Sequence, residues 1–326
     1  MPAGIASGAA PGASQHVAGS AVGVAAARPA PGQLREMLRD HAGLDFAELV
    51  PAGGGESGMV FRATDRAGTD SIVKILLGPG PGALGRLRAM AATVTRLRQR
   101  GYPAPVVTAV GHLPGLAYWI TERISGDPID PDSGAVARFV PELLRLNDAQ
   151  AGLGTGDPRE WPGLIGRTLT SGGNGYCVHA TLVANPGTRD LLAAIRRTGD
   201  RFGADIPPGR DFCHYDFSPL NLLSDGGSIT AVIDINPVVL AGDRAFDLAT
   251  MLFYGYDHDG IREVLRRRLL DLAEPGVACA YLAHMALRQV DWSLRYHPGA
   301  PGTQRHLRLA DMAAADIRAI AGWRLH

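Results

Sequence analysis

In the first third of the chain, apolar residues occur in short runs that are separated by glycine-rich or polar turns, a pattern typical of strands. We expect strands at residues 46–52, 59–64, 71–77, 106–110 and 116–120. Two segments instead carry apolar side chains at helical spacing, a short one at residues 34–41 and a longer one at residues 83–100. The pattern therefore predicts a five-stranded sheet with one main helix.

Beyond residue 127 the apolar positions recur mainly at the spacing of helices. Helices are expected at residues 134–153, 188–202, 260–273, 276–296 and 304–321, and another is entered at residues 242–249. A short apolar run, Ile229–Ile233, reads as a strand that leads to Asp234. We therefore expect an α+β fold with a small β-rich N-terminal lobe at residues 34–126 and a larger, mostly α-helical C-terminal lobe at residues 127–326.

Residues 1–33 differ from the rest because they consist mostly of Ala, Gly, Ser, Pro and Val and contain no acidic residue. We expect them to form a disordered extension. They lack the basic start and the Leu-rich centre of a strong signal peptide. No run in the chain approaches 18 apolar residues, so no membrane-spanning helix is expected.

Composition then restricts the class of partner. With 326 residues, 46% of them hydrophobic, the chain can bury a sizeable core. Its 32 basic residues equal its 32 acidic residues, so no basic surplus favours a nucleic acid. We therefore expect small-molecule partners, with no nucleic acid and no membrane. The three cysteines, Cys177, Cys213 and Cys279, fit buried thiols in a reducing cytoplasm better than a disulfide framework.

The turn between the first two expected strands is rich in glycine. Gly53, Gly55, Gly58 and Val60 have the spacing Gly-x-Gly-x-x-Gly-x-Val, and Ser57 lies within it. Glycines at this spacing let the backbone amides of a hairpin approach phosphate oxygens. Taken alone, a turn without a ligand fits the spacing as well. A third strand that carries a lysine favours a nucleotide-binding loop.

Lys74 is the only lysine among the 32 basic residues, and it lies inside the apolar run Ile72–Leu77. A coding preference for arginine explains why the other basic residues are arginines, but it does not explain why position 74 keeps a lysine. A compact ammonium performs tasks that a guanidinium does not, so Lys74 is a candidate phosphate ligand. Chance retention at the surface is the alternative. Residues 75–121 contain no Asp or Glu, so the counter-charge of Lys74 must come from elsewhere in the chain.

Residues 121–128 read as a connector between the lobes. Backbone N–H and C=O groups near Glu122 and Ile124 could pair with the edge of a purine base. A plain linker fits this segment equally well.

The segment from Cys213 to Asp234 contains the residue types that phosphoryl transfer needs. Its polar pattern is His214-x-Asp216-x-x-x-x-Asn221, followed by the strand that ends on Asp234. An Asp that accepts a hydroxyl proton, with an Asn and a second Asp that offer hard oxygen ligands to Mg2+, is the layout of a phosphoryl-transfer loop.

Together with the motif Gly242-Asp243-x-x-x-Asp247-Leu248-Ala249, this segment resembles the aminoglycoside phosphotransferase and choline-kinase-like family of small-molecule kinases, over roughly residues 40 to 320. The resemblance implies a two-lobed protein-kinase-like fold, ATP or GTP as the phosphoryl donor, and Mg2+. It implies Asp216 as the catalytic base, Asn221 and Asp234 as metal ligands, and Lys74 as the phosphate ligand.

His214, Asp243 and Asp247 have structural as well as catalytic interpretations. His214 either passes a proton or holds the loop through hydrogen bonds to the backbone. An Asp just before a helix is often its N-cap, and an Asp one turn later favours the same terminus. We favour loop bracing for all three. The short spacing from Asp234 to Gly242 leaves no room for the long activation segment of a protein kinase, which favours a small-molecule acceptor.

The resemblance places the acceptor over the C-terminal lobe. The candidate contacts are Tyr254, Tyr256, Asp257, Asp259, Arg288, Asp291, Trp292 and Arg295. Helix packing is the alternative for Trp292. Between Met251 and His326 ten arginines oppose eight acidic residues, a near balance that weakens a polycationic aminoglycoside as the substrate. Peptide, nucleoside and macrolide types stay open.

The expected function is an ATP- or GTP-dependent O-phosphotransferase that modifies an antibiotic, as a monomer or homodimer. The alternatives are a kinase of a metabolite or biosynthetic intermediate, a pseudokinase that senses nucleotides, and a purely structural interaction protein. The catalytic residue types are all present, which favours an enzyme. Two features depart from the family: many members have glycine where Tyr215 stands, and the main helix lacks the Glu that pairs with the strand lysine. The missing Glu slightly favours the pseudokinase.

Overall fold

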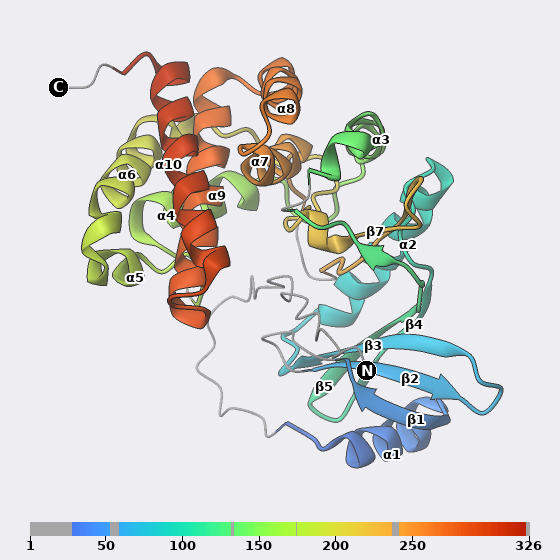
Figure 1. Cartoon of the computed structure of the whole chain (residues 1–326). Coiled ribbons are helices and arrows are strands. Elements are labelled where there is room, and N and C mark those ends of the chain that lie inside the picture. The colour runs from blue at the N-terminus through green and yellow to red at the C-terminus, as the bar shows by residue number, and fades with distance from the viewer. Residues whose placement is uncertain (1–27, 53–58, 132–133, 174, 237–240, 324–326) are drawn as a thin grey trace, which may run out of the picture.

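The computed structural model describes residues 28–52, 59–131, 134–173, 175–236 and 241–323. They form a β-sheet part with two helices, followed by a larger and mainly helical part (Figure 1). The expected mixed fold, with a β-rich N-terminal part and a helical C-terminal part, is confirmed.

The N-terminal sheet contains the five expected strands. They are β1 (Phe46–Pro51), β2 (Val60–Asp65), β3 (Asp70–Leu77), β4 (Val107–Leu113) and β5 (Leu116–Glu122). All neighbouring strands are antiparallel, in the order β1-β2-β3-β5-β4. The first three strands thus form an antiparallel meander, β4 and β5 form a hairpin, and β3 pairs with β5. Lys74 lies in the central strand β3.

A helix lies on each face of this sheet. Helix α1 (Pro31–Ala42) packs on β1 and β4, and its Leu34 and Leu38 belong to the same hydrophobic core as Val73 and Ile75 of β3. It begins three residues before the expected start, because Pro31 is well suited to the first helical position. Helix α2 (Ala83–Gln99) packs on the other face, where its apolar side chains join the core of the C-terminal part.

Strand alternation decides which face Lys74 occupies. Its neighbours Val73 and Ile75 point towards α1, so Lys74 points the opposite way. Its cross-strand partner Trp119 is packed in the core that contains α2 and the C-terminal helices. Lys74 is therefore directed towards the C-terminal part.

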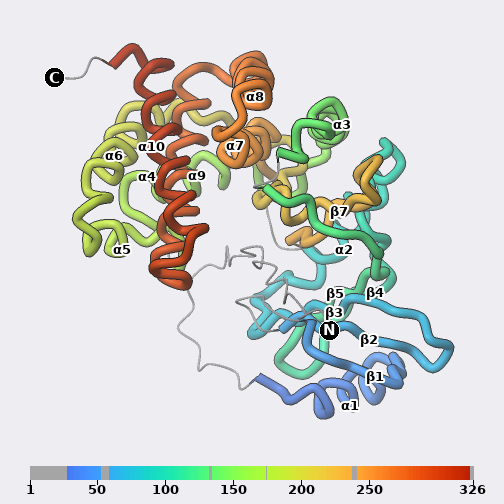
Figure 2. The backbone as a smooth tube through the Cα atoms, viewed as in Figure 1, coloured from blue at the N-terminus to red at the C-terminus, as the bar shows by residue number. Residues whose placement is uncertain are grey.

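A second, small sheet lies between the two parts. Its strands are β6 (Asp127–Pro128), β7 (Leu222–Ser224) and β8 (Ile229–Val232), in the order β6-β7-β8. Figure 2 shows the chain passing β7 between the N-terminal sheet and the helices. Strands β6 and β7 were not predicted, because two or three residues are too few to show an alternating pattern. This sheet joins the connector after β5 to the two strands that lie between Asn221 and Asp234.

The C-terminal part is built around one buried helix. Its helices are α3 (Val136–Ala149), α4 (Glu160–Ser171), α5 (His179–Ala184), α6 (Arg189–Phe202), α7 (Arg244–Gly255), α8 (Asp259–Leu272), α9 (Pro275–Tyr296) and α10 (Pro301–Ala321). Every residue of α9 from Val277 to Ser293 is buried, because α4, α6, α7 and α10 pack around it (Figure 1). None of the described helices combines the length and apolar character that crossing a bilayer requires.

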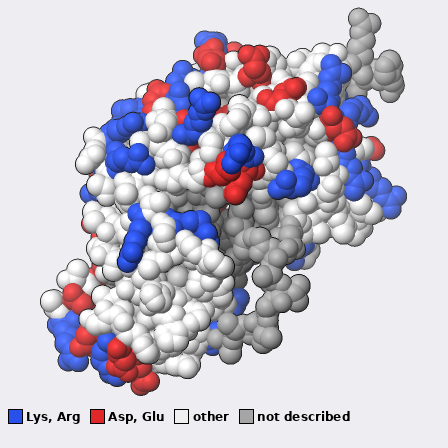
Figure 3. Space-filling view, turned by 180° about the vertical axis from the view of Figure 1, so that it is seen from behind, with Lys and Arg blue, Asp and Glu red and all other residues white. Residues whose placement is uncertain are grey.

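The face shown in Figure 3 carries basic and acidic side chains next to one another on both parts of the molecule. This arrangement agrees with the balanced charge of the sequence.

Candidate active site

Asp216 lies in the loop that precedes a short 3-10 turn at Pro219–Asn221. Its carboxylate is held at both oxygens. Arg288 Nη2 donates to Oδ1 at 2.6 Å, and Asn221 Nδ2 donates to Oδ2 at 3.0 Å. Burial raises the pKa of Asp216, and the positive charge of Arg288 acts against that rise. The plane of this carboxylate is therefore set by two partners.

The other two polar residues of the motif are brought to the same place by one backbone hydrogen bond. The amide of Ile233 donates to the carbonyl of Asn221 at 2.9 Å, which sets Asp234 beside the end of the catalytic loop. Asp234 has a left-handed backbone with φ of 61°. Asp is one of the residue types that tolerate this conformation.

Lys74 reaches this site from β3. Its Nζ donates to Oδ1 of Asp234 and, at 3.3 Å, to the carbonyl of Ile235. Both side chains are mostly shielded, with 17% and 18% of their surfaces exposed. The counter-charge that α2 does not provide thus comes from Asp234, a residue 160 positions further along the chain.

The donor set fits a nucleotide with Mg2+. Asn221 turns its Nδ2 towards Asp216, where it donates to the backbone carbonyl at 2.8 Å and to the carboxylate. The amide oxygen of Asn221 therefore faces away from Asp216. Together with the Asp234 carboxylate it offers the hard oxygen ligands that Mg2+ prefers, and Lys74 adds a positive charge for phosphate.

Asp247 stabilises the catalytic loop, residues 213–221, through hydrogen bonds to its backbone. It is fully buried and accepts hydrogen bonds from the backbone amides of His214 at 2.7 Å and Tyr215 at 2.9 Å. Gln150 Nε2 donates to the same carboxylate at 2.8 Å, and the Cys213 thiol at 3.4 Å. Burial raises the pKa of Asp247, and these donors oppose the rise. Two consecutive peptide groups of the loop are thus fixed by one side chain.

His214 and Asp243 also make contacts that hold the backbone. The Nε2 of His214 lies 2.8 Å from the carbonyl of Ile233, which joins the catalytic loop to the end of β8. Asp243 is the N-cap of α7, where it accepts from the amide of Ala245 at 2.9 Å and from the hydroxyl of Tyr281 at 2.8 Å. These contacts match the bracing interpretation, and they direct neither side chain at Asp216.

Tyr215 occupies a backbone conformation that suits glycine. Its φ is 70°, which costs a non-glycine residue about 1 to 3 kcal/mol. Its ring stacks on Phe246 with the centroids 5.1 Å apart. Its hydroxyl lies 2.7 Å from that of Tyr176 and 3.3 Å from Nε2 of His284. Aromatic packing and hydrogen bonds therefore stabilise a conformation that the backbone alone disfavours.

The buried imidazole of His284 predicts acid sensitivity. Burial, and to a smaller extent the nearby charge of Arg288, lower its pKa to about 3. In the unfolded chain its pKa is about 6.5, so the unfolded state binds the proton first and stability falls as the pH drops from about 6.5 towards 3. Between about pH 7.5 and pH 5 this residue is expected to remove about 2 kcal/mol from the free energy of unfolding.

Urea denaturation at these two pH values checks this expectation in the wild type and in His284→Gln. The variant is expected to lose about 2 kcal/mol less than the wild type on acidification. His306, whose pKa burial lowers to about 4, remains in both proteins and contributes equally. An equal pH dependence of the two proteins would contradict the assignment of the effect to His284.

The nucleotide side of the site is only partly described. Gly53, Gly55, Ser57 and Gly58 lie outside the described residues. The strands on either side of them pair directly, since the amide of Ala52 donates to the carbonyl of Val60 at 2.9 Å.

The connector residues Glu122 and Ile124 differ in whether their backbone N–H groups donate to another backbone carbonyl. The amide of Glu122 donates to the carbonyl of Val106 at 2.9 Å, and its carboxylate accepts from the amide of Val106 at 2.7 Å. Its N–H group is therefore occupied within the protein. The amide of Ile124 donates to no carbonyl in the described parts of the chain. The pairing of this connector with the edge of a base stays a prediction.

Three of the candidate acceptor contacts are buried and make polar contacts inside the protein. The hydroxyl of Tyr256 donates to Asp316 of α10 at 3.1 Å, and Asp291 is held by Arg295 at 2.7 Å with none of its side chain exposed. Arg288 is 1% exposed and contacts Asp216. Tyr256, Asp291 and Arg288 are therefore packed between helices, since α9 contacts α4, α6, α7 and α10, and α7 also packs against α10. The expectation that they contact an acceptor stays a prediction.

The remaining acidic candidates are also paired with arginines. Arg305 Nε lies 2.7 Å from the carboxylate of Asp257, and Arg262 lies 2.8 Å from that of Asp259. Asp259 is largely exposed at the start of α8, whereas Asp257 is partly covered.

The two aromatic acceptor candidates, Tyr254 and Trp292, are both buried. Tyr254 is 5% exposed, and its raised pKa reflects burial first and the nearby charge of Asp216 second. Trp292 is 7% exposed, and its ring lies 4.6 Å from that of His297. Of the acceptor candidates other than Arg288, Tyr254 is therefore the one that the structure brings near Asp216.

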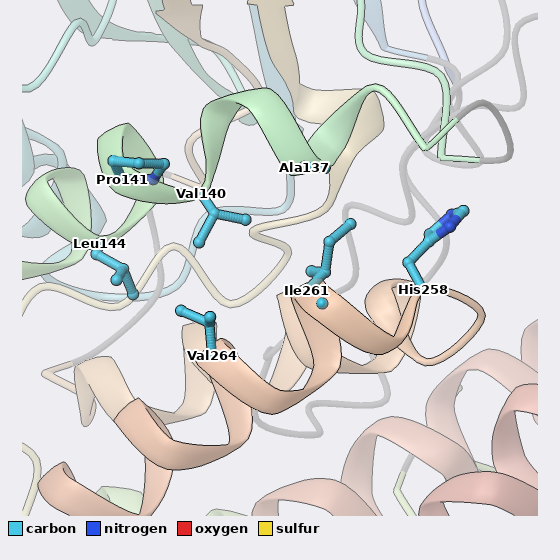
Figure 4. Close-up of a pocket in the computed structure, with 8 residues that line it drawn as sticks. Ala137, Val140, Pro141, Leu144, His258, Ile261 and Val264 are labelled. Carbon is cyan, nitrogen blue, oxygen red and sulfur yellow. The ribbon is translucent and has the colours of Figure 1, made fainter.

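A separate groove lies between α3 and α8. It has a volume of about 480 Å3, and Figure 4 shows Val140 and Leu144 of α3 facing Ile261 and Val264 of α8 across it. The residues that line it are mostly apolar and include none of the predicted site residues. We do not assign the reaction to this groove.

Several residues that shape the site were not singled out from the sequence. Gln150, Tyr176 and Phe246 support the catalytic loop from three different segments. They carry no motif, and each becomes recognisable only when the fold places it next to Asp247 or Tyr215.

Both the sequence and the fold of this chain are similar to those of known phosphotransferases. The sequence model of the phosphotransferase enzyme family matches residues 48–281. No curated protein matches the sequence significantly. Among solved structures, a mutant of aminoglycoside phosphotransferase APH(4)-Ia in complex with ADP and hygromycin B is 20% identical, with a TM-score of 0.59, over 89% of this chain and 99% of that chain.

Two further structures have the same fold. The choline kinase LicA from Streptococcus pneumoniae is 17% identical, with a TM-score of 0.55, over 87% of this chain and 99% of that chain. The aminoglycoside phosphotransferase APH(3'')-Id from Streptomyces rimosus, in complex with ADP and streptomycin, is 17% identical, with a TM-score of 0.53, over 77% of this chain and 96% of that chain. The two-lobed protein-kinase-like fold is thereby confirmed. Since the family match covers well over half of its length, this chain belongs to the phosphotransferase enzyme family.

Proposed function

We propose that this protein transfers the γ-phosphoryl group of ATP or GTP to a hydroxyl group of a small molecule, with an antibiotic as the first class to test. The observation that carries the proposal is the position of Asp216. Its carboxylate is fixed by Arg288 and Asn221, and the pair of Lys74 with Asp234 adjoins the same loop.

Each residue has a role that its chemistry supports. Asp216 would accept a hydrogen bond from the acceptor hydroxyl and take its proton as the new P–O bond forms. Asn221 and Asp234 would hold Mg2+, which supplies positive charge to the nucleotide phosphates. Lys74 would contact those phosphates as a point charge. Phosphoryl transfer depends mainly on positioning and charge stabilisation, which this arrangement supplies.

The ligands of similar proteins support both halves of the proposal. Neighbouring structures hold ADP or AMP-PNP, and they hold hygromycin B or streptomycin. Another neighbour is a choline kinase. An antibiotic is therefore the first acceptor class to test, and amino alcohols and other metabolites are the second.

The test is a screen of hydroxyl-bearing antibiotics and metabolites with purified protein, Mg2+ and either ATP or GTP. Mass spectrometry is expected to find one acceptor class that gains a single phosphoryl group, and a host that expresses the chain should lose sensitivity to that antibiotic. Asp216→Asn serves as the inactive control. The proposal fails if no acceptor is phosphorylated and nucleotide with Mg2+ does not shift the melting temperature.

Removing the ammonium of Lys74 is expected to weaken nucleotide binding. A hydrogen bond to a charged group contributes about 1.5 to 3 kcal/mol, so Lys74→Ala should raise the dissociation constant of ATP or GTP about 10- to 150-fold. Lys74→Arg is expected to restore little, because a planar guanidinium does not fit the space of a compact ammonium.

Isothermal titration calorimetry with Mg2+ and nucleotide measures both variants. Arg62→Ala is the matched control, since Arg62 lies on the neighbouring strand β2 and pairs with Glu48 at the surface. Unchanged affinity in Lys74→Ala would show that the single lysine has no part in binding phosphate.

A further inference from the structure

The buried guanidinium of Arg288 contacts both Tyr215 and Asp216 in the catalytic loop. Arg288 is 1% exposed in the middle of α9. Its Nη2 donates to Oδ1 of Asp216 at 2.6 Å, and its Nη1 donates to the backbone carbonyl of Tyr215. Its Cζ lies 5.3 Å from the centre of the Tyr215 ring. The planar fork of the side chain therefore spans the peptide group of one residue and the carboxylate of the next.

The contacts of Arg288 and Asn221 leave Asp216 little rotational freedom. Arg288 holds one carboxylate oxygen, and Asn221 holds the other. A carboxylate accepts up to about four hydrogen bonds, so lone pairs remain for an acceptor hydroxyl. Their direction is fixed by the two donors already in place.

Tyr215 is itself attached to the same helix. His284 lies one helical turn before Arg288 on α9, and its Nε2 is 3.3 Å from the Tyr215 hydroxyl. The ring is also stacked on Phe246. Helix α9 thus holds the loop at two points, through the Tyr215 ring and through the carbonyl and carboxylate that Arg288 contacts.

We propose that Arg288 is a positioning residue for the phosphoryl-transfer step, which together with Tyr215 sets the direction of the Asp216 carboxylate towards the acceptor hydroxyl. This inference rests on the proposed function in that Asp216 is taken as the base. Arg288 touches neither substrate nor nucleotide in this role. It acts by fixing the group that does.

The role requires a guanidinium. Two nitrogen donors in one plane reach the carbonyl and the carboxylate together, whereas an ammonium is a point donor that satisfies one of them well. Arg288→Lys keeps the charge beside Asp216 and removes the second contact. The variant therefore separates the effect of orientation from the effect of charge.

The first measurement uses water as the acceptor, because it needs no identified substrate. Hydrolysis of ATP and GTP with Mg2+ is measured for the wild type and for Arg288→Lys. A misplaced catalytic group lowers rates by up to about 100-fold, so kcat is expected to fall about 10- to 100-fold while KM for the nucleotide changes less than about twofold. Arg266→Lys, which alters an ion pair with Asp316 between α8 and α10, is the control that keeps wild-type kcat.

A rescue experiment distinguishes positioning from general stabilisation. Arg288→Ala leaves a space that a free guanidinium ion can occupy. Millimolar guanidinium chloride is therefore expected to restore part of kcat in this variant, whereas ammonium chloride is not. Circular dichroism melting curves confirm that the variants are folded. If Arg288→Ala does not fold, Arg288→Lys carries the test alone.

The third measurement is independent of activity. In a crystal structure of Arg288→Lys the Asp216 carboxylate is expected to be rotated or displaced relative to the wild type. An unmoved carboxylate, or a wild-type kcat in Arg288→Lys, overturns the inference. If Asp216→Asn also hydrolyses nucleotide at the wild-type rate, the proposed function fails as well. If Asp216→Asn is inactive and Arg288→Lys is not, the role of Arg288 alone is rejected. If the wild type hydrolyses no nucleotide, the crystal structure decides.

Discussion

Replacing Asp216 with asparagine is expected to lower phosphoryl transfer by about 10²- to 10⁴-fold, the range that general bases contribute. The amide has nearly the same shape as the carboxylate but does not take a proton from the acceptor hydroxyl at neutral pH. Its oxygen can still accept from Arg288, so the loop should keep its position on that side. The loss should therefore appear in kcat more than in nucleotide affinity.

The measurement is the initial rate with the acceptor found in the screen, or nucleotide hydrolysis where water is the acceptor. Asp316→Asn is the matched control, because Asp316 is also held by an arginine in the C-terminal part but lies on α10. It should retain the wild-type rate. A small loss in Asp216→Asn, comparable to that of the control, would remove Asp216 from the role of base.

The sheet and most of the helices were predictable because their residues repeat with a regular period. Strands β1 to β5 and helix α2 follow the expected ranges to within a few residues. Helix α4 was missed because Pro162, Gly163 and Gly166 interrupt its apolar pattern, although a proline is tolerated in the first turn. Helix α5 was missed because six residues are too few to show a period.

The candidate site was predictable where its chemistry lies in one continuous segment. The segment that contains Asp216, Asn221 and Asp234 has fixed spacing, and the contacts of Ile233 with Asn221 and His214 bring Asp234 beside the loop. The partners of these residues were not predictable in the same way. Lys74 pairs with a residue 160 positions away, and Arg288 with one that is 72 positions away. Such contacts depend on how α9 and β3 pack, which no local pattern encodes.

Arg288 and Lys74 illustrate the same physical point. The sequence identifies neither the partner of Arg288 nor that of Lys74, and the structure shows that each pairs with a carboxylate of the site. Burial makes an unpaired charge costly. Arg288 and Asp216 are both buried, so each charge depends on the other for its compensation. Removing Arg288 should therefore disturb the loop that carries Asp216.

The second large effect is expected in stability, from Asp247→Ala. The carboxylate of Asp247 satisfies the backbone amides of His214 and Tyr215 and the side chain of Gln150. A buried donor left without a partner costs about 1 to 3 kcal/mol. With two amides and one side-chain group affected, the free energy of unfolding should fall by about 3 to 5 kcal/mol, and the melting temperature by roughly 10 °C.

Urea denaturation followed by circular dichroism measures the loss, and Asp243→Ala provides the comparison. Asp243 caps α7 through one backbone amide and one tyrosine hydroxyl, so its removal should cost about 1 to 2 kcal/mol. Asp247→Asn should fall between the two, because one amide oxygen cannot replace two carboxylate oxygens and its NH2 group faces a backbone donor. Equal stability of Asp247→Ala and Asp243→Ala would mean that the loop amides of His214 and Tyr215 find other partners, and that the catalytic loop is held mainly from α9.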